Sequence, residues 1–230
     1  MTRLAALVAH DVRLQFCYGI YAAYAFVVAV YAAILLAAGP ALPSWVAPVL
    51  IFIDPAGVGF IFLGALMLLE RSEGVRRALA TSPLGATDYL ASKVVTLTAM
   101  ALVASAILMA IGHRPAEPPL LLLTVALTSM TYVGIGVLCA RRFATVNGYL
   151  IVAGALLTPL ILPGFLAFLD PLPVPLMLWP ATAQLRLMLV GLGAATATPW
   201  EVALMLAVCA GAAMLTLFLA QRDLRREFAK

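Results

Sequence analysis

Residues 46–111 read VAPVLIFIDPAGVGFIFLGALMLLERSEGVRRALATSPLGATDYLASKVVTLTAMALVASAILMAI, which is two long apolar runs separated by a short charged stretch. Seven charged residues fall between positions 70 and 93, in a chain that is 65% apolar and only 10% charged. Soluble domains contain about 25% charged residues. A helix needs about 20 apolar residues to cross the hydrocarbon core of a membrane. The stretch therefore predicts two transmembrane helices joined by a charged elbow, which we define as residues 70–93.

The same apolar pattern recurs along all 230 residues and predicts six spans. They cover residues 17–38, 46–69, 94–111, 119–140, 149–169 and 201–220. The intervals between them are too short to hold a soluble domain. The first 16 residues lack the apolar centre of a signal peptide, so we expect them to be retained. We predict one all-α integral membrane domain over residues 1–230.

The basic residues predict which way the chain crosses the membrane. With six spans, 12 of the 14 Lys and Arg residues fall on the side that holds both termini. Because basic residues collect on the cytoplasmic side of a membrane, we expect both termini and the elbow to face the cytoplasm. Trp45, Trp179 and Trp200 fall at the opposite interface, where we expect them to act as anchors. This distribution also explains the net charge of +4 without a nucleic-acid partner.

Three segments are not expected to span. In residues 1–16, apolar residues recur at helical spacing with Arg3 and Arg13 on the other side, which predicts an interfacial helix anchored by these arginines. The alternative is a basic tag without fixed structure. Residues 170–200 contain an apolar stretch too short to cross, and we expect a short outer re-entrant or interfacial helix there. Residues 221–230 form a cytoplasmic tail.

The charged elbow carries more charge than orientation requires. The other loop between spans on that side relies on Arg141 and Arg142 alone. We expect the second helix to continue beyond Glu70 and to end before Pro83. The next helix then begins near Thr87 or Asp88, with Tyr89 at the interface and Lys93 reaching toward lipid phosphates.

The elbow is either a solvated loop or a docking surface for another protein. The docking interpretation involves Glu70, Arg71, Glu73, Gly74, Arg76, Arg77, Ser82, Pro83 and Leu84.

Four residues inside the spans are candidates for a transport pathway. Asp54 lies in the second span, where a carboxylate usually faces water, protein or a ligand. It either contributes to a path for a cationic substrate or caps a helix that begins at Pro55. Tyr21, Tyr24 and Tyr31 share one face of the first span, and they either line a path for flat aromatic molecules or pack against a neighbouring helix.

These features together resemble the permease subunits of ABC-2 type transporters, and among them the bacterial drug exporters of fluoroquinolone type. The resemblance rests on Asp54-Pro55, Gly59-Phe60, Glu70, Gly74, Leu79, Ser82-Pro83-Leu84, Tyr89 and Ser92-Lys93. The six-span layout extends it over nearly the whole chain. It implies that the elbow is a coupling helix that binds in a groove of a separate ATP-binding subunit. It also implies a second permease subunit, identical or different. Many members of the family carry an acidic residue where Arg76 or Arg77 stands here.

The chain contains no GxxxxGK[ST] motif, so we expect ATP and Mg²⁺ to bind to the partner subunit. The three Cys and two His residues lack the spacing of a metal site, and we expect this chain to hold no cofactor or metal. The sequence thus predicts a non-enzymatic permease subunit of an ATP-driven exporter for a hydrophobic or amphipathic small molecule. The alternatives are a secondary carrier, an intramembrane enzyme, or a membrane subunit of a cofactor-export or assembly complex. A carrier usually has ionisable residues near mid-membrane, and only Asp54 comes near this.

Overall fold

The computed structural model describes residues 3–73, 85–111 and 117–228, and every regular element in these ranges is a helix. Six helical units in these ranges are long and apolar enough to cross a membrane. They are α2 (Ile20–Ala38), the continuous unit of α3 (Val46–Gly57), η2 (Val58–Phe62) and α4 (Leu63–Ser72), α6 (Ala86–Ile111), α7 (Pro118–Ala140), α8 (Val146–Ile161) continued by η3 (Leu162–Phe168), and α11 (Pro199–Phe228). The predicted six-span helical membrane fold is confirmed.

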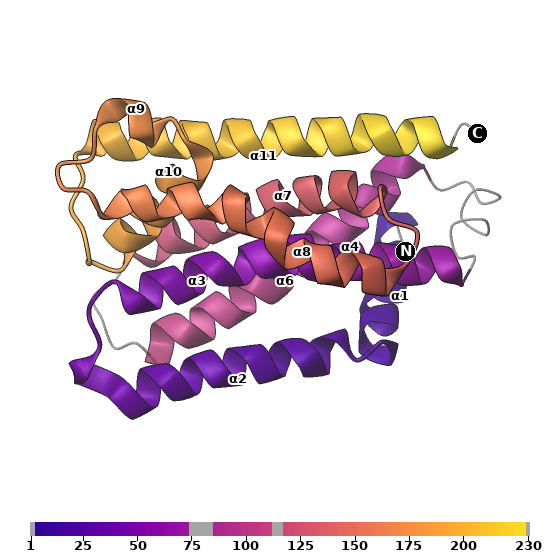
Figure 1. The fold of residues 1–230 in the computed structure, drawn as a ribbon, viewed down its shortest axis with the longest axis horizontal. Coiled ribbons are helices and arrows are strands. Elements are labelled where there is room, and N and C mark those ends of the chain that lie inside the picture. Colours follow the sequence, from indigo (N-terminus) through magenta and orange to yellow (C-terminus); the bar gives the residue numbers. More distant parts are fainter. Residues whose placement is uncertain (1–2, 74–84, 112–116, 229–230) are drawn as a thin grey trace.

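The long helices run side by side along the longest axis of the molecule (Figure 1). Helix α1 (Arg3–Cys17) crosses them at one end, and the last turns of α11 lie at that same end. An even number of crossings brings the two chain ends together in this way. The first and last spans, α2 and α11, lie at opposite edges of the bundle and bury little of their surface.

Helix α1 turns a narrow polar stripe toward the bundle. Leu7, Asp11 and Gln15 are buried, and their spacing of four residues places them on one side of a helix. Apolar residues such as Val12 and Phe16 are exposed instead. The predicted helix is therefore present, but polar groups make part of its contact with the protein while apolar groups face outward. That arrangement is suited to a helix whose outer side contacts lipid.

The second span changes its winding at one point. Pro55 lies inside α3, where it has no N–H to donate to the carbonyl of Ile51. The π-helical segment η2 follows within three residues. Because α3 already begins at Val46, Asp54 is not an N-cap, and the prediction of a helix that starts at Pro55 is wrong.

The second and fourth spans approach closely through glycine. A Cβ placed on Gly136 of α7 would lie 2.5 Å from the carbonyl oxygen of Gly59 in η2, and one on Gly59 would lie 2.8 Å from the backbone nitrogen of Val133. Only hydrogen fits at these positions, so the two backbones lie in direct contact. This contact places α7 at the centre of the bundle, against α3, η2 and α4.

The segment before the last span contains two short helices, α9 (Val174–Met177) and α10 (Pro180–Gly191). Helix α10 is almost entirely buried against η3, α11, α7 and α3. Its Arg186 donates hydrogen bonds to the carbonyl oxygens of Ala167, Leu169 and Thr196 and pairs with Asp170. The predicted short helix is present, and its arginine is satisfied by the surrounding backbone. The three tryptophans at this end of the bundle are exposed, as anchors would be: Trp45, Trp179 and Trp200.

Candidate functional site

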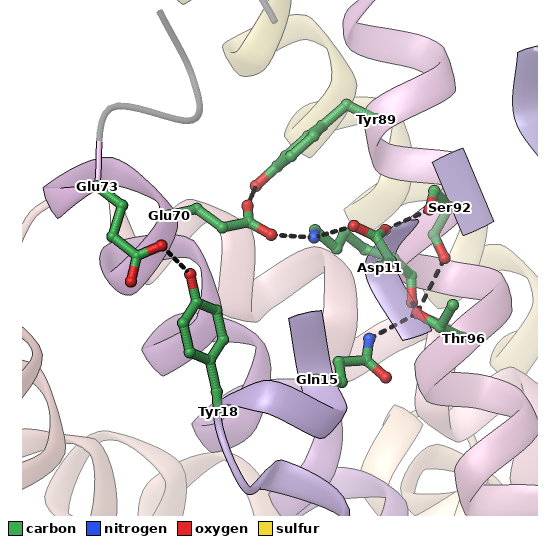
Figure 2. Close-up of polar contacts among 9 residues, drawn as sticks. Asp11, Gln15, Tyr18, Glu70, Glu73, Tyr89, Ser92 and Thr96 are labelled. Atoms are coloured by element: carbon green, nitrogen blue, oxygen red, sulfur yellow. Dashed lines mark hydrogen bonds and ion pairs between the residues drawn. The ribbon is translucent and has the colours of Figure 1, made fainter. Parts of the chain in front are cut away.

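A buried cluster of polar side chains joins α1, α4 and α6 (Figure 2). It lies at the end of the bundle that α1 crosses (Figure 1). We define this polar cluster as Asp11, Glu70, Tyr89, Ser92 and Lys93. Lys93 lies at its centre, with none of its surface exposed. Its ammonium donates to Asp11 Oδ1 at 2.7 Å and to Glu70 Oε1. The second oxygen of each acid is also paired, because Ser92 donates to Asp11 Oδ2 and Tyr89 donates to Glu70 Oε2 at 2.6 Å.

All the donors of the polar cluster come from one helix. Tyr89, Ser92 and Lys93 are spaced at i, i+3 and i+4 in α6, so they share one face. The acceptors come from the two helices packed beside that face, Asp11 from α1 and Glu70 from α4. The cluster therefore ties the two helices that flank residues 74–84 to each other and to α1.

The polar cluster is buried but electrostatically satisfied. Taking a carboxylate or an ammonium out of water costs several kcal/mol per ion, which only close pairing and further hydrogen bonds offset. Here each of the four carboxylate oxygens accepts a hydrogen bond, and the Lys93 ammonium also lies 5.1 Å from the centre of the Tyr89 ring. Removing Lys93 would leave two neighbouring carboxylates without a cation.

Two further contacts extend the cluster. Gln15 Nε2 of α1 donates to Thr96 Oγ1 of α6 at 3.0 Å. Tyr18, just after α1, donates to the carboxylate of Glu73 at the end of α4 (Figure 2). Burial of the phenol, and next its bond to Glu73, raise the pKa of Tyr18. Helix α1 is thus held to both neighbours by side-chain bonds.

The structure places the predicted elbow residues in three groups. Glu70 is only 1% exposed, and its carboxylate faces Lys93 and Tyr89, so it offers no surface for docking in this conformation. Arg71 and Glu73 are exposed at the end of α4. The remaining predicted docking residues lie outside the described residues: Gly74, Arg76, Arg77, Ser82, Pro83 and Leu84.

The predicted anchoring roles of Tyr89 and Lys93 need correction. Both side chains are buried in the polar cluster and do not reach toward lipid phosphates. Helix α6 begins at Ala86, close to the predicted start near Thr87 or Asp88, but α1 packs over its first turns and covers these side chains. Arg13 is exposed, and the side chain of Arg3 lies outside the described part of the structure. Sequence reasoning also missed Asp11, Gln15 and Thr96. One pattern in the sequence could have indicated a buried polar contact here: the spacing of Tyr89, Ser92 and Lys93, which places all three on one face of a helix.

A second buried acid lies within the spans. Asp54 is 4% exposed, and its Oδ2 accepts a hydrogen bond from the hydroxyl of Tyr24 at 2.6 Å. Its Oδ1 has no hydrogen-bond partner among the described residues. The Tyr24 hydroxyl also lies 3.4 Å from the carbonyl oxygen of Met100 in α6. Two of the four predicted pathway residues are therefore in direct contact.

Tyr24 also lines a groove between α1, α2 and α6, which we refer to as the lateral groove. Its volume is about 690 Å³, within the range of small-molecule sites. Tyr21 lines it as well, and most other lining residues are apolar, among them Val8, Val28 and Met100. Tyr31, the fourth predicted pathway residue, is half-buried and does not line the groove.

The described residues contain no group of three or more His, Cys, Asp or Glu side chains placed to hold a metal ion. The contacts described at the two sites are ion pairs, hydrogen bonds and apolar contacts. Of the two, the polar cluster is closed by its own partners, whereas the Asp54 carboxylate keeps one oxygen free.

Comparison with known proteins gives a match over nearly the whole chain. A family model described as the Fluoroquinolones export permease protein family matches residues 2–229. Fluoroquinolones export permease proteins from two strains of Mycobacterium tuberculosis, CDC 1551 / Oshkosh and ATCC 25618 / H37Rv, are each 26% identical over 204 residues. The aligned part covers 88% of this chain and 86% of each relative. No solved structure matches the chain significantly. The family match includes the polar cluster, the lateral groove and the charged elbow.

Proposed function

The chain belongs to the Fluoroquinolones export permease protein family, and we propose from this that it is the membrane subunit of an ATP-driven exporter. It is a multi-pass membrane protein of a drug export family. The bacterial cell membrane is the proposed location, with both termini in the cytoplasm, as the distribution of Lys and Arg predicts. The proposed cargo is a hydrophobic or amphipathic small molecule of fluoroquinolone type, moved out of the cytoplasm or the inner leaflet.

The proposed energy source is a separate ATP-binding subunit that holds ATP and Mg²⁺. This chain contains no phosphate-binding GxxxxGK[ST] loop of its own. A second permease subunit, identical or different, completes the proposed assembly. The exposed apolar faces of α2, α8 and α11 offer surface for it and for lipid.

The polar cluster is the observation that best supports ATP coupling through the elbow. Residues 74–84 connect α4 to α6, and the bonds of Lys93 and Tyr89 to Glu70 join these two helices directly where they flank that connection. Asp11 adds α1 to the same unit. Because breaking a buried pair costs about 3 to 5 kcal/mol, a partner that displaces the elbow moves the three helices together.

The proposed docking surface then lies outside the polar cluster. Arg71 and Glu73 are exposed at the end of α4, next to the elbow residues that lie outside the described ranges. Glu70 acts instead as an internal link that transmits displacement from the elbow to α6. Tilting of α6 and of the α3–α4 unit changes the spans around the lateral groove, since α6 forms one of its walls.

A reconstituted complex tests this proposal. The permease is purified with a candidate ATP-binding subunit, and drug-stimulated ATP hydrolysis and transport are measured in proteoliposomes. We expect Gly74→Trp and Glu73→Lys to abolish copurification or stimulation. Arg142→Glu, a charge reversal in the other predicted cytoplasmic loop, is the matched control and retains both.

The outcome that contradicts the proposal is drug transport at full rate without the ATP-binding protein. The predicted orientation is checked separately with single cysteines at Ser82 and Ala116, labelled in intact cells by an impermeant thiol reagent. Labelling at position 82 alone reverses the orientation.

A proton-coupled secondary carrier is the second candidate, and the buried Asp54 carboxylate favours it. The two mechanisms differ in their energy source. Transport by a carrier stops when a protonophore collapses the proton gradient and continues when ATP is removed, and an ATP-driven exporter responds in the opposite way.

A further inference from the structure

We propose that the lateral groove binds an amphipathic organic cation that enters from the lipid, with Asp54 supplying the counter-charge. This inference rests on the proposed export function and specifies the substrate class and the place where the substrate first binds. It is carried by the position of the groove, by the free oxygen of Asp54, and by the contacts of Tyr24.

The lateral groove opens on the outer surface of the bundle. Four of its lining residues are 42–62% exposed: Val12 of α1 and Val95, Val103 and Ile107 of α6. Exposed apolar side chains at the mouth of a groove in a membrane bundle contact lipid chains, so an amphipathic molecule dissolved in the bilayer reaches the groove without crossing water. The apolar walls match the apolar body of such a molecule.

Behind Tyr24, which lines the groove, lies an acid that has no cation beside it among the described residues. Asp54 makes no ion pair among the described residues, and Oδ1 accepts no hydrogen bond from them. A carboxylate in this position gains from a positive charge far more than from a neutral group, and it repels an anion. Charge complementarity therefore selects a cation over a lipid with a phosphate headgroup or an anionic drug.

Tyr24 lies between the groove and Asp54. Its contacts provide a way to release the Asp54 carboxylate for binding to a ligand. The Tyr24 ring lines the groove while its hydroxyl donates to Asp54 Oδ2. The carbonyl oxygen of Met100, on the opposite wall, lies 3.4 Å from the same hydroxyl. Rotation of the hydroxyl about its C–O bond directs its hydrogen to the Met100 carbonyl oxygen, so that the hydroxyl still donates a hydrogen bond while neither oxygen of Asp54 accepts one from it. The neighbouring Tyr21 ring offers a second contact by the attraction between cations and aromatic faces.

The test uses two ions of similar shape and opposite charge. The full-length permease is placed in phosphatidylcholine nanodiscs without its ATP-binding partner, and equilibrium binding of tetraphenylphosphonium and tetraphenylborate is measured after subtraction of empty nanodiscs. We expect saturable binding of the phosphonium at one site per chain and no saturable binding of the borate.

Variants connect the binding to the groove. Asp54→Asn keeps the shape of the side chain and is expected to weaken phosphonium binding by about tenfold or more. Tyr21→Ala is expected to weaken it about threefold. Tyr24→Phe removes the competing hydroxyl, so binding is expected to strengthen about twofold. Glu117→Gln, which neutralises an exposed acid outside the groove, is the matched control and leaves the affinity unchanged.

Three results would overturn the inference: equal binding of both ions, unchanged phosphonium affinity in Asp54→Asn, or displacement of both ions by lysophosphatidylcholine. The last result would identify the groove as a lipid site. Because the measurement omits the ATP-binding subunit, failure here leaves the proposed ATP coupling untouched. Conversely, phosphonium binding at the groove together with transport that does not depend on ATP would contradict the proposed ATP-driven exporter. The proposed cation site would still stand.

Discussion

The polar cluster and the Asp54–Tyr24 pair both bury carboxylates, but they leave them in opposite states. In the polar cluster, Lys93, Tyr89 and Ser92 of a single helix satisfy all four oxygens of Asp11 and Glu70. At Asp54, one tyrosine hydroxyl satisfies one oxygen and the other has no partner among the described residues. A fully paired buried network holds its helices in one arrangement, whereas a half-paired acid retains capacity for a ligand. The comparison assigns a mechanical role to the cluster and a binding role to Asp54.

The largest expected effect is that of Lys93→Met. This change leaves Asp11 and Glu70 buried together without a cation, so we expect a loss of about 3 to 5 kcal/mol of stability. Thermal unfolding of the purified protein in detergent measures it. The triple variant Lys93→Met, Glu70→Gln, Asp11→Asn removes all three charges and is expected to recover much of the loss. A single variant that melts like the parent would show that the cluster does not hold the helices together.

Glu70→Ala is expected to have a smaller effect on stability and a large one on coupling. It removes the link between α4 and α6 while Asp11 still pairs with Lys93. Losing the hydrogen bonds that Tyr89 and Lys93 donate to Glu70 costs about 1 to 3 kcal/mol. In the reconstituted complex, we expect basal ATP hydrolysis to persist and drug stimulation to be lost. Stimulation at the parent level would remove Glu70 from the transmission route.

Asp54→Asn separates the two regions most directly. Because the carboxylate has only one hydrogen-bond partner among the described residues, replacing it by a neutral amide of the same shape is expected to change stability by less than about 1 kcal/mol. Binding of an organic cation falls in the same variant. Thermal unfolding and binding are measured on one preparation. Destabilisation as large as that of Lys93→Met would make Asp54 a structural residue, and the distinction between the two regions would fail.

The smallest expected effect is that of Tyr18→Phe, at the edge of the polar cluster. The variant loses the hydrogen bond to Glu73, which is worth about 1 kcal/mol or less at a partly exposed site. Because the pKa of Tyr18 is raised in the folded protein, the protonated phenol is favoured there. Its contribution is fully present below pH ~10, the unfolded pKa of tyrosine, and declines as the pH rises toward the folded pKa. Stability measured between pH 8 and 11 should therefore fall less steeply in Tyr18→Phe.

Local sequence patterns were sufficient to predict the six-helix architecture. They led to wrong predictions for the surroundings of several side chains. The six spans follow from apolar length, and α2, α7 and α11 begin within a few residues of the predicted positions. The Asp54–Pro55 pair has the pattern of a helix start, yet the apolar run before it already forms helix from Val46. The position of Lys93 near a predicted interface suggested a contact with lipid. That interpretation failed because α1 covers this face of α6.

The sequence by itself determined that this chain crosses the membrane six times, since the cost of unsatisfied backbone groups in lipid requires helices of that length and polarity. It also determined which residues carry charge inside an apolar chain. Only the tertiary structure decided which of those charges meet. Lys93 reaches Glu70 across 23 positions and Asp11 across 82, and nothing in the local pattern brings α1 onto α6. The same packing gives Asp54 one hydrogen-bond partner among the described residues, Tyr24, because pairing of buried charges depends on distances between helices and not on spacing along one of them.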